Sequence, residues 1–175
     1  PAAMARDEAV ADALRRLTSA DLRASKDQVI FERDEIRTQA GTAFGVFTPY
    51  KNAWLKRLGT SDITEHSVAP RAGQLQPDPA QRGIPSLVDL GFAATNLAEL
   101  PLATGMSGAQ SLFADFVERM DDYAARRDFP ALKGPSYLSA HLRFGTISIR
   151  QLVRHAADRR SQGADVWLAE LIWRE

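Results

Sequence analysis

The chain has 175 residues, of which 45% are hydrophobic and 25% charged, and its 22 basic residues balance 22 acidic ones. This is the composition of a globular protein with no net field to attract nucleic acid, and the absence of cysteine excludes disulfides and thiolate metal sites. Three scattered histidines form no metal-binding pattern, and without a signal-peptide core or an apolar run of ~18 residues we expect a cytoplasmic protein with no membrane partner.

The first part of the chain predicts one helix and one strand. Residues 6–17 have helical spacing, with an apolar stripe typical of a surface helix in a layered domain, formed by Val10, Ala13, Leu14 and Leu17. Residues 29–31 form a short apolar run bounded by charge, which predicts a buried edge strand or last strand of a sheet. Because a strand needs a partner, we expect most of that sheet to precede residue 1.

Residues 44–58 predict a short helix that begins at Thr48 and Pro49. We expect Trp54 and Leu55 to be its docking residues. Its basic side chains are expected to form a solvated face, made of Lys51, Lys56 and Arg57.

Residues 59–102 have the character of a linker, because they hold five of the nine prolines and show little periodicity. Their apolar residues are too numerous for a free tether, so we expect this segment to run over a domain surface. A short helical turn is expected near 86–91. The apolar residues are Val68, Leu75, Ile84, Leu87, Val88, Leu90 and Phe92.

A longer helix is predicted to open a second domain, beginning with a capping box from Ser107 to Gln110. Apolar residues then recur at helical spacing: Leu112, Phe113, Phe116, Val117, Met120 and Ala124. Tyr123 and residues 126–128 follow at its C-terminal end, where the helix dipole favours cations. The attraction of the helix dipole for cations is by itself one explanation for Arg126 and Arg127.

The turn of Gly134, Pro135 and Ser136 follows a helix break at Pro130. Hydroxyls and free backbone N–H groups gather there, just before a short helix over 138–142, as they do where proteins bind phosphate. A plain turn that closes one helix and caps the next has the same sequence, so both interpretations stay open.

Two further helices are predicted at the end of the chain. Gly145 ends the helix at 138–142, and Ser148 to Gln151 cap the next one. Its inward residues are Ile149, Leu152, Val153 and Ala156. The last helix begins at 163–165 and runs to residue 175 without a C-cap, so we expect an internal fragment of a longer protein.

The last helix presents two different faces. Trp167, Glu170 and Arg174 fall at i, i+3 and i+7, with Trp173 beside them. Leu168, Leu171 and Ile172 form the core side. Two indoles that flank a carboxylate suit amphipathic packing at a domain edge, and they also suit a flat ligand such as a base or a flavin.

Three segments carry a family resemblance. RRDFPALKGPSYLSAHLRFGTISIRQL, followed by WLAELIWRE, resembles the flavin-domain core of the DNA photolyase and cryptochrome family. VFTPYKNAWLKRL resembles the segment before the interdomain linker of bacterial cyclobutane-dimer photolyases. The resemblance implies a mainly α chain in three parts: the end of an α/β antenna domain (1–58), an interdomain linker (59–106) and the first helices of an all-helical FAD-binding domain (107–175).

The resemblance implies light-dependent repair of cyclobutane pyrimidine dimers, with reduced FAD as electron donor and damaged DNA as partner. The alternative is a cryptochrome-like blue-light photoreceptor without repair. The full-length enzyme is expected to be a monomer, and the fragment is expected to bind FAD weakly or not at all and to self-associate through Leu171, Ile172 and Trp173. Gly45 stands where folate-binding members have lysine, which leaves a second antenna chromophore, folate or deazaflavin, unassigned.

The resemblance also implies roles for single residues. Those near FAD are Tyr123 by its adenosine diphosphate portion, Ser136, Leu138 and Ser139 at the pyrophosphate, and Trp167 against the flavin. Those near DNA are Arg127 at a phosphate and Glu170, Trp173 and Arg174 at the flipped lesion, with Glu170 and Trp173 as the catalytic pair. Pro135 replaces a threonine that many members have, which removes a hydroxyl and an N–H donor.

Overall fold

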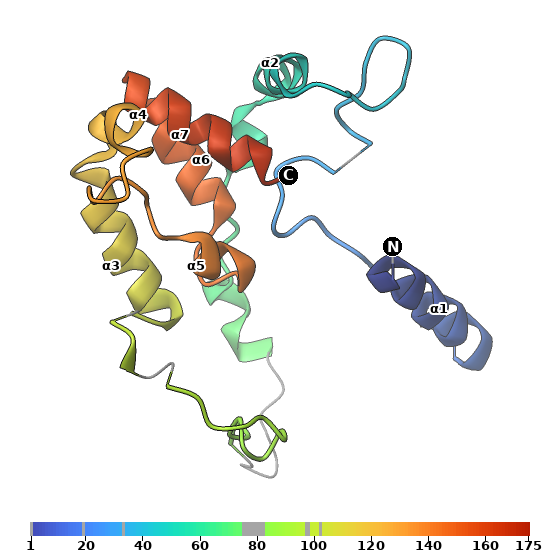
Figure 1. Cartoon of the computed structure of the whole chain (residues 1–175). Coiled ribbons are helices and arrows are strands. Elements are labelled where there is room, and N and C mark those ends of the chain that lie inside the picture. Colours follow the sequence, from blue (N-terminus) through green and yellow to red (C-terminus); the bar gives the residue numbers. More distant parts are fainter. Residues whose placement is uncertain (1, 19, 33, 75–82, 97–98, 102) are drawn as a thin grey trace.

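A computed structural model describes residues 2–18, 20–32, 34–74, 83–96, 99–101 and 103–175 (Figure 1). These residues form helices and no strands, which confirms the mainly α fold class. The α-helices are α1 (Ala2–Leu17), α2 (Phe47–Arg57), α3 (Gly105–Val117), α4 (Tyr123–Arg126), α5 (Ser139–Arg143), α6 (Ile149–Asp158) and α7 (Gln162–Trp173). Short 3-10 turns are η1 (Thr60–Ile63), η2 (Ala69–Gln74) and η4 (Met120–Asp122).

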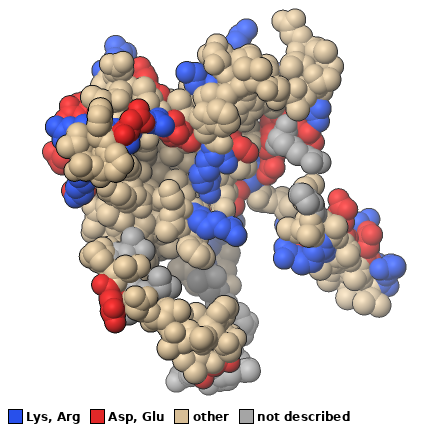
Figure 2. Space-filling model, viewed as in Figure 1, with Lys and Arg blue, Asp and Glu red and all other residues tan. Residues whose placement is uncertain are grey.

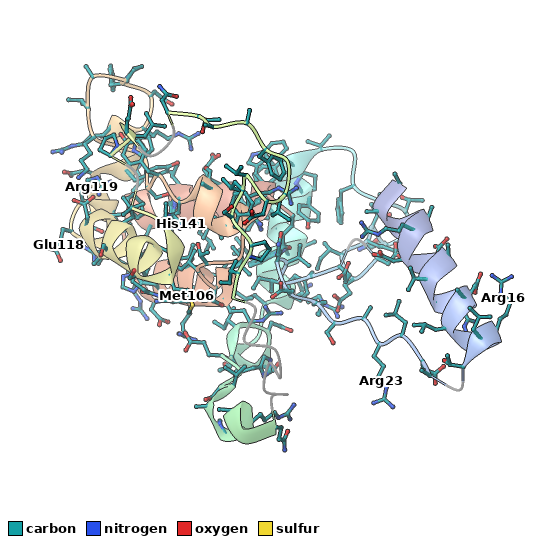
Figure 3. All side chains as sticks on the ribbon, turned by 90° about the horizontal axis from the view of Figure 1, so that it is seen from below. Arg16, Arg23, Met106, Glu118, Arg119 and His141 are labelled. Atoms are coloured by element: carbon teal, nitrogen blue, oxygen red, sulfur yellow. The ribbon has the colours of Figure 1, made fainter. Side chains whose placement is uncertain are left out.

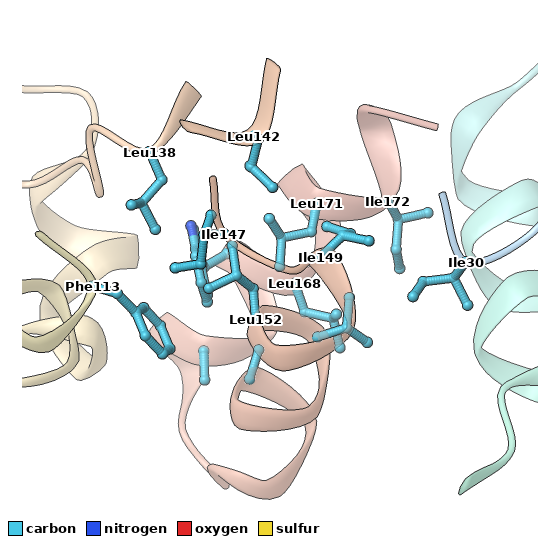
Figure 4. Packing of buried hydrophobic residues seen from close by; sticks show 14 of the residues in the cluster. Ile30, Phe113, Leu138, Leu142, Ile147, Ile149, Leu152, Leu168, Leu171 and Ile172 are labelled. Atoms are coloured by element: carbon cyan, nitrogen blue, oxygen red, sulfur yellow. The ribbon is translucent and has the colours of Figure 1, made fainter. Parts of the chain in front are cut away.

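Helix α7 is the centre of the helical body and packs against α4, α6 and η4, while α2 lies against it from the other side (Figure 1). Trp167, Leu168, Leu171 and Ile172 of α7 are buried. The inward stripe expected for α6 is confirmed, because Ile149, Leu152, Val153 and Ala156 are all buried. In Figure 4 the side chains of Leu168 and Leu171 lie among those of Ile149 and Leu152, and Ile30 lies beside Ile172. Each large aliphatic side chain buried in this way stabilises the fold by ~1.5–3 kcal/mol.

Gly163 determines how closely α7 begins against η4. A Cβ on this residue would lie 2.1 Å from the carbonyl oxygen of Met120, so only glycine permits the contact. Ser161 caps the helix by accepting the Ala164 N–H at 3.2 Å. The predicted start of the last helix is thereby confirmed to within a residue or two.

The strand predicted at 29–31 is wrong. Ile30 and Phe31 are buried but irregular, and the Ile30 N–H donates to the side chain of Glu175. Phe31 packs edge-on against Trp54, with ring centroids 5.3 Å apart. The apolar run docks on helices, because a carboxylate supplies the acceptor that a neighbouring strand would have supplied.

Three predictions about helix ends and docking are also wrong. Helix α3 has Thr104 as its N-cap, so Ser107 lies inside the first turn and forms no capping box. The helix stops at Val117, and the chain reaches Tyr123 through η4. In α2, Trp54 is fully buried as expected, but Leu55 is 40% exposed.

The linker predicted at 59–106 is only partly described, since Leu75, Pro77 and Pro79 lie outside the described residues. The helical turn near 86–91 is confirmed by the bond from the Leu90 N–H to the Ser86 carbonyl, at 3.2 Å. The expected packing on a domain surface is wrong for six apolar residues, which are all exposed: Val68, Ile84, Leu87, Val88, Leu90 and Phe92. The three-part division of the chain stays a prediction.

Helix α1 lies apart from the helical body (Figure 1). Its predicted apolar stripe is open to solvent in part, with Val10 45% and Leu17 82% exposed. None of the described helices combines the length and hydropathy needed to cross a membrane.

Candidate functional site

Helices α4 and α7 bring three of the predicted residues together. Arg127, directly after α4, places its Nη1 atom 2.5 Å from Oε1 of Glu170 on α7. The Arg127 guanidinium lies over the Tyr123 ring, 5.4 Å from its centroid. The hydrogen bond that Arg127 donates to Glu170 raises the pKa of Arg127 further, so the arginine remains a cation at every physiological pH. Burial raises the pKa of the Tyr123 phenol.

Trp167 is a core residue in this structure, with 3% of its surface exposed. Its ring lies 4.7 Å from that of Phe116 and 6.2 Å from that of Phe113. Phe116 in turn meets Tyr123 edge-on at 5.8 Å. A series of tilted and edge-on aromatic contacts therefore runs from the core to the Arg127–Glu170 pair, and the contact of Trp167 with a flavin stays a prediction.

Trp173 is 62% exposed, and its ring stacks on Phe47 of α2 at 4.0 Å and 11°. It borders an open cleft of about 340 Å³ whose other walls include Tyr50 and Glu175. The expected self-association surface is wrong for Leu171 and Ile172, which are buried. Only the indole of that trio is available to a partner.

The loop that ends at α5 carries the three residues predicted at the pyrophosphate, and their role there stays a prediction. Ser139 is exposed in the first turn of α5, and Ser136 is half-buried. Leu138 is fully buried and anchors the loop, while Tyr137 has a φ of 58°. Gly134 allows the loop to pack closely against α4, because a Cβ at this position would lie only 2.7 Å from the Arg126 carbonyl oxygen.

The side chain of Arg174 is tied to the protein backbone. It donates to the carbonyl oxygens of Gln28 at 2.7 Å and Leu142 at 3.0 Å. It also borders a cleft of about 770 Å³. The geometry gives Arg174 a structural role between two segments, and its contact with DNA stays a prediction.

Three polar residues with structural importance were not found from the sequence: Glu175, His141 and Arg119. Glu175 accepts the Ile30 N–H and, at 2.5 Å, the Trp54 indole N–H, and burial raises its pKa. His141 is buried, with Nδ1 2.8 Å from the Thr146 hydroxyl and no partner for Nε2 among the described residues. Arg119 donates to backbone carbonyls of the loop before α5. No periodicity or motif signals contacts of this kind.

Charges on the visible face are mixed rather than segregated. Figure 2 shows basic and acidic atoms side by side around α4 and on α1, and a group of Lys and Arg atoms in the middle of the face. Among the described residues, no cluster of His, Asp or Glu is suited to a metal ion.

Comparison with known proteins places the chain in a family. Residues 1–71 match the model of the family described as DNA photolyase. The deoxyribodipyrimidine photo-lyase of Vibrio cholerae is 34% identical over 164 residues, which cover 87% of this chain and 33% of that protein. That of Escherichia coli is 33% identical over 180 residues, covering 98% of this chain and 36% of the relative.

The fold agrees with this match. The crystal structure of a bacterial class III photolyase from Agrobacterium tumefaciens superposes with a TM-score of 0.78 and 24% identity, over 99% of this chain and 37% of that one. The chain belongs to the DNA photolyase family. It spans about a third of the length of the curated relatives that it matches.

Proposed function

We propose that the protein that carries this chain repairs cyclobutane pyrimidine dimers in DNA in a light-dependent reaction, with reduced FAD as the electron donor. The observation that carries the proposal is the exposed indole of Trp173, which lies one helical turn from Glu170 on a chain whose relatives are named deoxyribodipyrimidine photo-lyases. Those names do not favour the photoreceptor alternative.

The residues present suit the flavin cofactor of this reaction. The exposed hydroxyl of Ser139, the half-buried hydroxyl of Ser136 and the first N–H groups of α5 are donors suited to a pyrophosphate. The Tyr123 ring contacts the ring of Phe116, which in turn contacts the ring of Trp167 in the core. When bound, reduced FAD supplies the electron that splits the dimer under light, and the protein supplies position and electrostatics.

The substrate face follows from the same geometry. A dimer inside a duplex is out of reach of a buried cofactor, so it must be swung out of the stack and held against an aromatic wall. The free face of Trp173 offers that wall, with Phe47 supporting the other face. In this proposal Arg127, with 29% of its side chain exposed, contacts a DNA phosphate, and Glu170, with 38% exposed, hydrogen-bonds the polar edge of the dimer.

A repair assay tests the proposal. The protein, loaded with FAD and reduced, is mixed with a duplex that contains one cyclobutane dimer and is kept in the dark or under blue light. We expect dimers to disappear only in the light and only with FAD, while a duplex with a 6–4 photoproduct stays unchanged. Preferential dimer binding without light-dependent loss of dimers, or no preference for the dimer, would contradict the proposal. The second antenna chromophore and the monomeric state stay predictions.

A further inference from the structure

Arg119 joins two separate parts of the helical body. It follows α3, and only 12% of its side chain is exposed (Figure 3). Its Nε donates to the carbonyl oxygen of Lys133 and its Nη2 to that of Pro135, both at 2.8 Å. Its Nη1 donates to the backbone and carboxylate oxygens of Asp115, also at 2.8 Å. One guanidinium thus ties the loop at 133–135 to the end of α3.

The guanidinium is itself held in position. It lies 5.2 Å from the centroid of the Phe116 ring, which is fully buried. Asp115 also accepts a bond from the Lys133 ammonium at 2.8 Å, and that bond, together with the charges of Lys133 and Arg119, lowers the pKa of the Asp115 carboxyl. The carboxylate therefore stays ionised at neutral pH and keeps the Arg119 fork oriented toward the loop.

The loop is clamped from two sides. On one side, Gly134 packs against the Arg126 carbonyl oxygen so closely that a Cβ would lie 2.7 Å away. On the other side, Arg119 binds the Pro135 carbonyl. In a trans peptide the C=O and the following N–H point in opposite directions, so this bond aims the Ser136 N–H away from Arg119. Within the described residues that N–H has no acceptor of its own.

We propose that Arg119 is the positioning residue of the phosphate-binding loop. It does not touch the ligand, but it fixes the peptide that presents the Ser136 N–H and hydroxyl to the pyrophosphate of FAD. This inference rests on the proposed function, since it takes the loop at 134–139 as the pyrophosphate site. It also explains how the loop tolerates Pro135, which has no N–H: the carbonyl of that residue anchors the loop.

Separate binding of the two halves of the cofactor tests the inference. ADP carries the pyrophosphate without the flavin ring, and riboflavin carries the ring without the pyrophosphate. The full-length protein that carries this chain is titrated with ADP and with riboflavin in a calorimeter, and the affinities are compared for wild type, Arg119→Met and Arg119→Lys. The matched control is Arg150→Met, because Arg150 likewise donates to loop carbonyls, those of Lys26, Asp27 and Val29, away from this loop.

We expect Arg119→Met to weaken ADP binding about 10- to 100-fold, the loss of one or two charge-assisted hydrogen bonds, and to leave riboflavin affinity unchanged. Arg119→Lys keeps the charge and most of the stem, so it folds even where Arg119→Met does not. A single ammonium cannot span both carbonyls, so lysine should restore little ADP affinity. Hydrogen exchange of the amides at 133–138 should quicken in both Arg119 variants and not in Arg150→Met.

Equal losses of ADP and riboflavin affinity, or ADP affinity and loop exchange no different from those of Arg150→Met, would overturn the inference. A wild-type protein that binds no ADP would overturn it too, because the loop would then not be a pyrophosphate site. Tight ADP binding that depends on Arg119, without light-dependent repair, would instead refute only the proposed function. Repair that is insensitive to Arg119 in every measurement would refute only the inference.

Discussion

Replacing Arg127 by alanine separates a DNA contact from a purely structural ion pair. In the structure Arg127 is 29% exposed, bonds Glu170 at 2.5 Å and covers the Tyr123 ring. This chain has no net charge, so any contribution that it makes to the proposed binding of DNA must come from a few placed cations. If Arg127 neutralises one phosphate, Arg127→Ala weakens binding to damaged and undamaged duplex alike.

The size of this effect follows from counterion release. One phosphate contact changes the slope of log affinity against log salt by ~0.9. The affinity advantage of wild type over Arg127→Ala should therefore shrink about 3.5-fold as salt rises from about 50 to about 200 mM. The cost in stability should stay below ~1 kcal/mol, because both partners of the ion pair are partly exposed.

The assay is fluorescence anisotropy at several salt concentrations, combined with thermal unfolding. Arg126→Ala is the matched control, because the neighbouring Arg126 is 47% exposed and pairs with Asp122 at 2.9 Å. The reasoning is refuted by an unchanged salt slope in Arg127→Ala, or by equal changes in both variants. Either result would reduce Arg127 to a residue that stabilises the junction of α4 and α7.

Three other changes test the face and the core of the site. Trp173→Ala should weaken the binding of dimer-containing DNA by about 5- to 150-fold, because stacking one base on an aromatic ring contributes that much affinity, and should hardly affect undamaged DNA. Equal losses on both DNAs in an anisotropy titration would mean that the indole only packs on Phe47. Glu170→Gln should lower the repair yield per absorbed photon more than it lowers the affinity for dimer-containing DNA in the dark, because the proposed stabilisation by Glu170 acts on the dimer after electron transfer. An unchanged yield would show that Glu170 takes no part in the chemistry. Burial raises the pKa of Glu175, so its contribution to stability is fully present below its unfolded pKa of about 4.5 and is lost as pH rises through the higher folded value. Wild type should therefore lose stability relative to Glu175→Gln as pH rises above about 4.5 in urea titrations, and a constant difference would show that the carboxylate is not desolvated.

Periodicity was sufficient to predict burial where the buried face depends only on the spacing of apolar residues within one helix. The inward stripe of α6 and the buried Trp54 were predicted because spacing of 3.6 residues and aromatic size determine which side chains leave water. The short apolar run at 29–31 was misread for a related reason. Its hydrophobicity correctly indicated burial, but a strand and a docking segment differ only in what satisfies the backbone, and here the acceptor is Glu175, 145 residues away.

The candidate site was predictable only in its residue types. Spacing placed Glu170 and Trp173 on one helix, and the family resemblance singled out Arg127. The pairing of Arg127 with Glu170 depends on the angle at which α4 meets α7, which no local pattern encodes. Arg119 was missed because its partners are backbone carbonyls, and every residue has one; only the path of the loop selects Lys133 and Pro135.

The central claim is that the face carrying Arg127, Glu170 and Trp173 receives a flipped pyrimidine dimer beside a flavin. The most direct test is a crystal structure of the protein bound to FAD and to a duplex with one cyclobutane dimer. We expect the dimer outside the DNA helix and against the Trp173 ring, a neighbouring phosphate at Arg127, and the FAD pyrophosphate at residues 136–139. A dimer still stacked in the duplex, or a pyrophosphate held elsewhere with Trp173 closed off from the DNA, would contradict it.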